Sequence, residues 1–140
     1  MILLDTNVVS ELLRDPPHSA VTAWASAVPR SEMVTTSITE AELRLGVAML
    51  PRSDRRERLQ VALDSIFRRW LGSVVLPFDS LAARHFAVFR ARRRREGRSV
   101  APNDAMIAAI AIAHGVAAIA TRNTPDFEGC GVPLINPWDA

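Results

Sequence analysis

Three acidic residues directly follow predicted strands or stand in the first turn of the helix that comes next. Asp5 follows the apolar run 2–4, Glu42 lies near the start of a helix predicted over 39–50, and Asp104 opens a helix predicted over 103–114. Ligand sites in open α/β sheets lie at the carboxyl ends of the strands, so we expect these side chains to share one edge. Carboxylates without a basic partner repel one another, and the usual remedy is a hard divalent cation, Mg²⁺ or Mn²⁺. Such a site suits the chemistry of phosphate esters.

Each of these acids also has a purely structural interpretation. Asp5 could cap the turn after the strand, because Asp favours helix starts. Thr39 and Glu42 have the spacing of a capping box, with Thr39 at the N-cap and Glu42 three residues on. Asp104 could complement the dipole of its helix. The residues alone leave both interpretations open.

The elements that must position these acids alternate along the chain. Short apolar runs predict strands, amphipathic runs predict helices, and the helix over 103–114 is apolar nearly all round, which predicts burial. Fully apolar strands alternating with helices predict a parallel sheet covered on both faces, an α/β fold. The predicted strands are 2–4, 33–37, 74–76, 116–120 and 132–135, and the other predicted helices are 8–14, 19–28, 54–71 and 79–96.

Length and composition set the class of the protein. The chain has 140 residues, of which 49% are hydrophobic and 23% charged, so it has the size and composition of one globular domain. The apolar stretch 105–120 is interrupted by His114 and Gly115 and is too short to span a membrane. The N-terminus lacks the basic region of a signal peptide, and the lone Cys130 allows no internal disulfide. We therefore expect a cytoplasmic protein with no membrane contact.

Four segments together resemble the PIN-domain ribonucleases, in particular the VapC and FitB type of toxin. They occur in the family's order and spacing over nearly the whole chain, and the closing Asn136-Pro137-Trp138 is also similar to the FitB-type end. The resemblance implies a single PIN domain over residues 1–140, with a Rossmann-like parallel β-sheet, helices on both faces and an acidic Mg²⁺ pocket. The matching segments are 2–7, 37–46, 103–109 and 120–127.

The resemblance also implies roles for individual residues. Asp5 and Asp104 would hold the metal, and Glu42 would complete the carboxylate cluster. Thr6 matches the polar residue that follows the first Asp in the family and would support a carboxylate or a water. Asn7 continues that motif.

One position departs from the family pattern. The family often has a fourth acid just after a Thr-Arg pair, whereas here Thr121-Arg122 is followed by Asn123. An Asn can bind a water but adds no negative charge. Asp126 lies three residues further on and is the candidate substitute. The departure puts a second tightly held metal in question, but not the first.

The implied activity is the cleavage of RNA. Mg²⁺, or Mn²⁺ in its place, would position a phosphodiester, and a water oriented by Glu42 or Asn123 would attack the phosphorus in line. The products would carry a 5′-phosphate and a 3′-hydroxyl. Proteins recognise folded RNA mostly through its exposed loops, so a structured RNA such as tRNA is the expected target.

A basic segment is the candidate RNA contact. All 17 basic residues of the chain are Arg, the net charge is only +2, and six arginines with one glutamate fall between positions 90 and 98. Arginines in the last turn of a helix also complement its dipole, so the same residues have a structural interpretation. The candidates for RNA phosphates are Arg92, Arg93, Arg94, Arg95 and Arg98.

Toxins of this family are usually encoded beside a small antitoxin. The resemblance therefore implies a cognate VapB-like or FitA-like antitoxin that fills a groove of the toxin and blocks the acidic pocket, often with an Arg. It also implies a homodimer. DNA would be contacted only indirectly, through the antitoxin.

Two other families with acidic sites on α/β sheets do not fit the sequence, and two further functions stay open. A receiver domain needs a Lys near its phosphate, and the chain has none. A haloacid-dehalogenase-like phosphatase needs an Asp at the position of Asn7. A catalytically silent PIN fold that binds RNA or a partner remains open because of Asn123. A metal-dependent DNA nuclease is the nearest alternative, because the same carboxylates can cleave either backbone.

Overall fold

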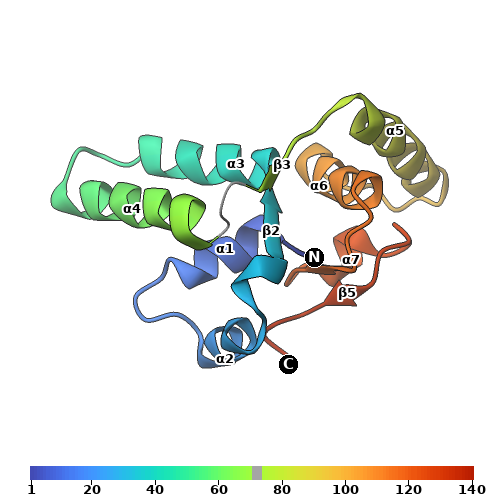
Figure 1. The fold of residues 1–140 in the computed structure, drawn as a ribbon. Helices are drawn as coiled ribbons and strands as arrows, with labels where there is room; N and C mark the ends of the chain where they lie inside the picture. Colours follow the sequence, from blue (N-terminus) through green and yellow to red (C-terminus); the bar gives the residue numbers. More distant parts are fainter. Residues whose placement is uncertain (71–73) are drawn as a thin grey trace.

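Strand β1 (Ile2–Leu4) lies at the centre of a parallel sheet in the computed structural model, which describes residues 1–70 and 74–140 (Figure 1). Within that part of the chain the sheet has five strands in the order β3-β2-β1-β4-β5. Ile2 stands opposite Met33 on one side and Ala118 on the other, so β1 pairs in register with both neighbours. The other strands are β2 (Met33–Thr36), β3 (Val75–Leu76), β4 (Ala118–Ala120) and β5 (Leu134–Ile135).

Helices cover both faces of this sheet, as the sequence predicted. Figure 1 shows α5 and α6 on one side and α1 and α4 on the other. Leu3 packs in the core cluster that contains α6, and Leu4 packs with Val8 and Val9 of α1, because successive strand residues point to opposite faces. The helices are α1 (Thr6–Leu12), α2 (Ser19–Ala27), η1 (Arg30–Glu32), α3 (Ser37–Ala48), α4 (Asp54–Ser65), η2 (Ile66–Trp70), α5 (Ser80–Arg95), α6 (Pro102–Ala113) and α7 (Thr124–Phe127).

Helix α6 is the buried helix that the sequence predicted. Its residues 107–111 are all fully buried, and it makes its most extensive packing with α5. Pro102 stands in its first turn, where the missing N–H costs nothing. The helix ends at His114, and Gly115 then adopts a φ of 59°, a left-handed conformation that glycine accepts without strain. This rigid support carries Asp104 in its first turn.

The start of α3 differs from the prediction. The predicted cap was Thr39, but Thr36 is the N-cap, and its hydroxyl accepts a hydrogen bond of 3.0 Å from the Thr39 backbone N–H. Strand β2 ends at Thr36, so the helix begins as soon as the strand stops. The predicted capping box of Thr39 and Glu42 is therefore wrong. Glu42 does not cap the helix and is available for other contacts.

Other element bounds also differ from the prediction. Helix α1 begins two residues early because Asp5 caps it, and α4 gives way to a wider turn, η2, after Ser65. The predicted helix 54–71 includes Leu71, which lies outside the described residues. The short helix α7 was not predicted, and it positions Asp126. Within residues 1–70 and 74–140, no helix has the length and hydropathy needed to cross a membrane.

Candidate active site

Asp5 lies at the carboxyl end of β1 and is almost completely buried. One carboxylate oxygen accepts the backbone N–H of Thr6 at 2.8 Å, so Asp5 does cap α1. The other oxygen accepts the Thr121 hydroxyl at 2.8 Å and the Asn7 amide at 3.0 Å. Burial raises the pKa of Asp5, while the donors from Thr121, Thr6 and Asn7 lower it and the charge of Glu42 raises it. The interpretation of Asp5 as a helix cap is therefore confirmed, and its role in a functional site stays a prediction.

Glu42 reaches the same edge of the sheet from α3. Its carboxylate accepts the Thr6 hydroxyl at 3.0 Å, and that hydroxyl also lies 3.0 Å from the hydroxyl of Thr39. Thr39 is fully buried and holds Thr6 between the two helices. Thr39 was not among the predicted site residues, because its spacing to Glu42 fits a helix cap. The alternative spacing from Thr36 to Thr39 was the signal that could have found it.

Asp104 stands where several negative charges meet. Its pKa is raised to about 7, first by burial and then by the charge of Asp5, with further contributions from Asp126 and Glu42. The carboxyl groups of Asp104 and Asp126 lie within hydrogen-bonding reach of each other. None of the ion pairs formed within residues 1–70 and 74–140 involves any of these four acids. The site is thus a cluster of four carboxylates with no basic partner.

Asn123 is placed differently from Asp126. Its side chain is exposed, and only its backbone is tied to the site, through an N–H that donates to the Thr121 hydroxyl at 3.0 Å. Asn7 is bound more closely, because its amide links Asp5 to the backbone N–H of Arg122, which lies 3.1 Å from the Asn7 oxygen. Of the two candidates for the fourth acid position, Asp126 is the one in contact with Asp104.

The arginines of the basic segment do not form one surface. Arg93 is 4% exposed, and its guanidinium donates to the backbone carbonyls of Arg98, Pro125 and Glu128 at 2.7, 3.1 and 2.9 Å. The prediction that Arg93 is free to bind RNA is wrong, because burial and three carbonyl acceptors hold it inside the fold.

The other four candidate arginines of this segment are exposed, but only some of them have polar partners. Arg92 donates to the Gly129 carbonyl, and Arg98 is paired with Glu128 at 2.7 Å. Arg94 and Arg95 are exposed and have no polar partner in the described part of the chain. They stay candidates for RNA contacts, and Arg92 and Arg98 would first have to leave their partners.

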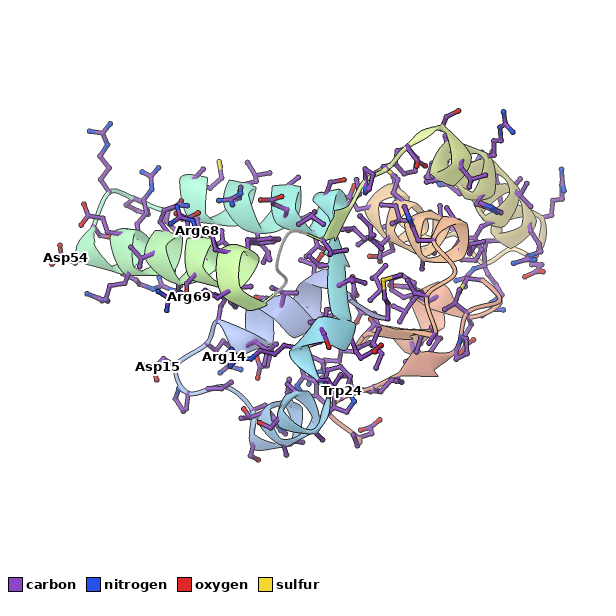
Figure 2. All side chains as sticks on the ribbon, in the orientation of Figure 1. Arg14, Asp15, Trp24, Asp54, Arg68 and Arg69 are labelled. Carbon is purple, nitrogen blue, oxygen red and sulfur yellow. The ribbon has the colours of Figure 1, made fainter. Side chains whose placement is uncertain are left out.

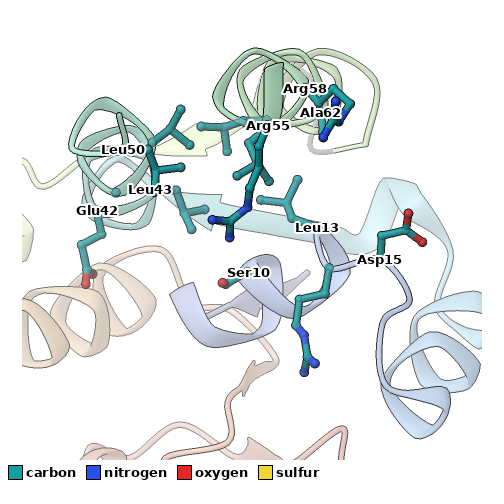
Figure 3. Close-up of a pocket in the computed structure, with 14 residues that line it drawn as sticks. Ser10, Leu13, Asp15, Glu42, Leu43, Leu50, Arg55, Arg58 and Ala62 are labelled. Atoms are coloured by element: carbon teal, nitrogen blue, oxygen red, sulfur yellow. The ribbon is translucent and has the colours of Figure 1, made fainter. Parts of the chain in front are cut away.

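A groove of about 890 Å³ opens beside Glu42, between α1, α3 and α4 (Figure 3). Its walls are largely apolar, and Arg55 extends into it from α4. Arg14 and Asp15 border it at the end of α1, where Figure 2 labels them. The apolar residues that line the groove are Leu13, Leu43, Val47, Leu50, Leu59, Ala62 and Leu63. Of the four acids of the cluster, Glu42 is the one that lines this groove.

Comparisons with known proteins agree with this geometry. The family model of the PIN domain matches residues 2–128. The VapC ribonuclease Y4jK of Sinorhizobium fredii is 42% identical over 139 residues, which are 99% of each chain. Toxin FitB of Neisseria gonorrhoeae is 38% identical over 138 residues, again 99% of each chain.

Two further matches extend this result. The tRNA(fMet)-specific endonuclease VapC of Shigella flexneri is 32% identical over 97% of this chain and 96% of its own. A solved structure of FitAB bound to the IR36 DNA fragment contains a chain with 37% identity and a TM-score of 0.91, over 99% of this chain and 96% of that one. Full-length similarity, the sheet order and the converging acids all agree: the chain belongs to the PIN-domain family and, within it, to the VapC and FitB toxins.

Proposed function

We propose that this protein is a metal-dependent endoribonuclease, the toxin of a toxin–antitoxin pair. The convergence of Asp5, Glu42, Asp104 and Asp126 without a basic partner carries the proposal. Such a cluster is electrostatically costly in a protein that has no cation to bind. Relatives named as ribonucleases support RNA as the substrate.

A hard divalent cation fits the chemistry of these donors. All four are carboxylates, and Mg²⁺ and Mn²⁺ prefer oxygen ligands. Within the described ranges, no group of three or more His, Cys, Asp or Glu side chains has the arrangement of a preformed metal site. Mg²⁺ does not require such a cage, because it keeps several waters and binds through one or two carboxylates. We propose Asp5 and Asp104 as the direct ligands and Glu42 as the third acid of the site.

Several polar residues around the acids would have supporting roles in catalysis. Thr121, Thr6 and Asn7 hold the Asp5 carboxylate in one orientation. Thr6 also donates a hydrogen bond to Glu42, and in this proposal Glu42 would orient the attacking water and accept its proton. Asp126 lies within hydrogen-bonding reach of Asp104 and would support that side chain. A bound divalent ion would supply charge neutralisation of the phosphate and a lower pKa for the attacking water.

The antitoxin would lie in the groove between α1, α3 and α4. Apolar residues of the groove could hold the side chains of a helix or an extended tail, and Glu42 lines the groove, so an antitoxin Arg that reached Glu42 would meet the acidic cluster. Solved relatives include a member of the VapBC family of toxin–antitoxin systems and VapBC complexes bound to DNA, which supports an antitoxin partner. We propose that contact with DNA is only indirect, through the antitoxin. We also propose a homodimer, one PIN domain over residues 1–140, and a site of action in the cytoplasm.

Cleavage of total tRNA by the purified protein tests the proposal. We expect discrete fragments with Mg²⁺ and none with EDTA, with Asp5→Asn or with Asp104→Asn. Matched single-stranded RNA and DNA of one sequence separate a ribonuclease from a DNA nuclease. Cleavage that survives EDTA and both substitutions would indicate a contaminant. A folded protein that cleaves no RNA with either Mg²⁺ or Mn²⁺ would instead be a silent binding module.

A further inference from the structure

The side chain of Arg122 is stacked on an aromatic ring beside the acidic cluster. Its guanidinium carbon lies 5.1 Å from the centre of the Trp138 ring, and the Arg side chain is exposed. A guanidinium over an indole face is held by its attraction to the ring's electrons, and Trp is the strongest such partner. This contact holds the cation near the ring. The Arg122 guanidinium makes no hydrogen bond within residues 1–70 and 74–140, so its N–H groups can donate to a ligand.

Both members of this pair are fixed to the site by the backbone. Arg122 follows Thr121, which binds Asp5, and its own N–H donates to the Asn7 oxygen at 3.1 Å. Trp138 packs against the core cluster that contains Leu4 and Val8, and its backbone N–H donates to the Asn136 side chain at 3.1 Å, just beyond β5. Arg122 therefore follows the carboxyl end of β4, at the same edge of the sheet as Asp5, and is the next residue after a group that binds Asp5.

The charge of Arg122 has no acidic partner in the described ranges. Arg14, Arg44 and Arg98 all form ion pairs with carboxylates, whereas none of the ion pairs within residues 1–70 and 74–140 includes Arg122. The acidic cluster repels a polyanion such as RNA. A fixed, unpaired cation at the border of that cluster offsets this repulsion where a substrate phosphate must approach.

We propose that Arg122, held against Trp138, binds the RNA phosphate next to the cleaved bond. This inference rests on the proposed ribonuclease function and adds a substrate-binding residue to it. The planar fork of a guanidinium matches two phosphate oxygens, so one side chain can fix both the position and the orientation of the backbone. Trp138 is a positioning residue in this arrangement, because it acts only through Arg122.

Equilibrium binding of a short fluorescein-labelled single-stranded RNA tests the inference. All proteins carry Asp104→Asn, which blocks cleavage, and binding is followed by fluorescence anisotropy over a series of salt concentrations. The test variants add Arg122→Ala, Arg122→Lys or Trp138→Leu. The matched control adds Arg52→Ala, which removes an exposed arginine in the connection between α3 and α4. Thermal unfolding of each variant checks that its fold is intact.

We expect Arg122→Ala to weaken RNA binding about tenfold and to lower the steepness of the salt dependence by about 0.7, the value for one phosphate contact on a single strand. Arg122→Lys should retain the salt dependence with intermediate affinity, since it keeps the charge and loses the fork. Trp138→Leu should weaken binding less than Arg122→Ala does. It should have no further effect when Arg122→Ala is already present.

Two results would overturn the inference. One is an Arg122→Ala variant with the affinity and salt dependence of its parent, and the other is an equal loss in Arg52→Ala. If the wild type cleaves RNA in either case, the proposed function stands and only the role of Arg122 fails. If the parent binds no RNA and the wild type cleaves none, the proposed function and this inference fail together.

Discussion

The hydroxyl of Thr121 donates a hydrogen bond of 2.8 Å to the carboxylate of Asp5, a residue 116 positions away in the sequence. This contact joins the ends of the adjacent strands β4 and β1, and both residues are buried. It orients the acid at the centre of the carboxylate cluster and partly offsets the effect of burial on the pKa of Asp5. The strand ends are therefore coupled directly to the chemistry of the site.

Replacement of Thr121 by valine should affect both stability and activity. Thr121→Val has a similar shape but removes the donor to Asp5 and the acceptor of the Asn123 N–H. We expect a loss of about 1–3 kcal/mol in the free energy of unfolding, because a buried carboxylate loses a donor. RNA cleavage should also slow. Urea denaturation and cleavage rates check this, and Thr121→Ser, which keeps the hydroxyl, should restore most of both.

Substitutions at Asp126 and at Asn123 should differ sharply in how they change the Mg²⁺ concentration that cleavage requires. We expect Asp126→Asn to raise the Mg²⁺ concentration needed for cleavage by about 10–100-fold, the usual cost of losing a group that supports a metal ligand. Asn123→Ala should change it little, because that side chain is exposed. Cleavage rates over a Mg²⁺ titration make the comparison. A larger loss in Asn123→Ala than in Asp126→Asn would reverse the assignment of the fourth group.

The stability of the metal-free protein should fall as pH rises. The pKa of Asp104 is about 7 in the folded protein against 3.8 for the unperturbed group, so between these values the folded state holds a proton that the unfolded chain releases. This contribution to stability is fully present below pH 3.8, declines as pH rises and is lost above about pH 7. Negative charges then repel one another in the folded site.

Thermal unfolding in EDTA at about pH 5 and about pH 8 measures this effect. The wild type should lose more stability than Asp104→Asn between the two conditions, because the Asn cannot ionise. Mg²⁺ should raise the unfolding temperature of the wild type more at the higher pH, where the carboxylates are charged. If the difference in unfolding temperature between the wild type and Asp104→Asn is the same at both pH values, the prediction is contradicted.

Replacement of Arg93 should destabilise the fold, whereas replacement of Arg94 or Arg95 should not. Arg93→Ala leaves three backbone carbonyls without their donor and creates a cavity beside Phe89, over whose ring the Arg93 guanidinium lies. We expect a loss of about 2–4 kcal/mol in the free energy of unfolding. Arg94→Ala and Arg95→Ala remove exposed side chains and should leave stability nearly unchanged. Urea denaturation separates the two classes, and equal losses in all three variants would contradict it.

Gly46 should tolerate a side chain. A Cβ built at this position in α3 would meet nothing within 4 Å, and the residue lines the groove one turn from Glu42. Gly46→Ala should therefore raise the free energy of unfolding by about 0.5–1 kcal/mol, because alanine loses less conformational freedom in a helix. Cleavage of RNA should be unaffected. Denaturant unfolding measures the gain, and a destabilised variant would indicate that this part of α3 needs the glycine.

The sequence alone determined the elements and the order of the acids. Short apolar runs specify strands, and the repeat of apolar residues specifies helices, because both depend on local periodicity. Asp5, Glu42 and Asp104 could be assigned to one edge of the sheet because each follows a strand or opens a helix. The parallel sheet covered on both faces followed from the same pattern.

The tertiary structure decided what these elements do with individual side chains. Arg93 and Arg94 are adjacent and of the same type. Arg93 is buried and donates hydrogen bonds to the backbone carbonyls of Pro125 and Glu128, whereas Arg94 is exposed. Asp126 rather than Asn123 meets Asp104, because the unpredicted helix α7 turns it inward. The stacking of Arg122 on Trp138 likewise depends on β4 and β5 lying side by side. The burial and the contacts of such side chains depend on segments that are far apart in the chain. Local sequence patterns therefore cannot predict them.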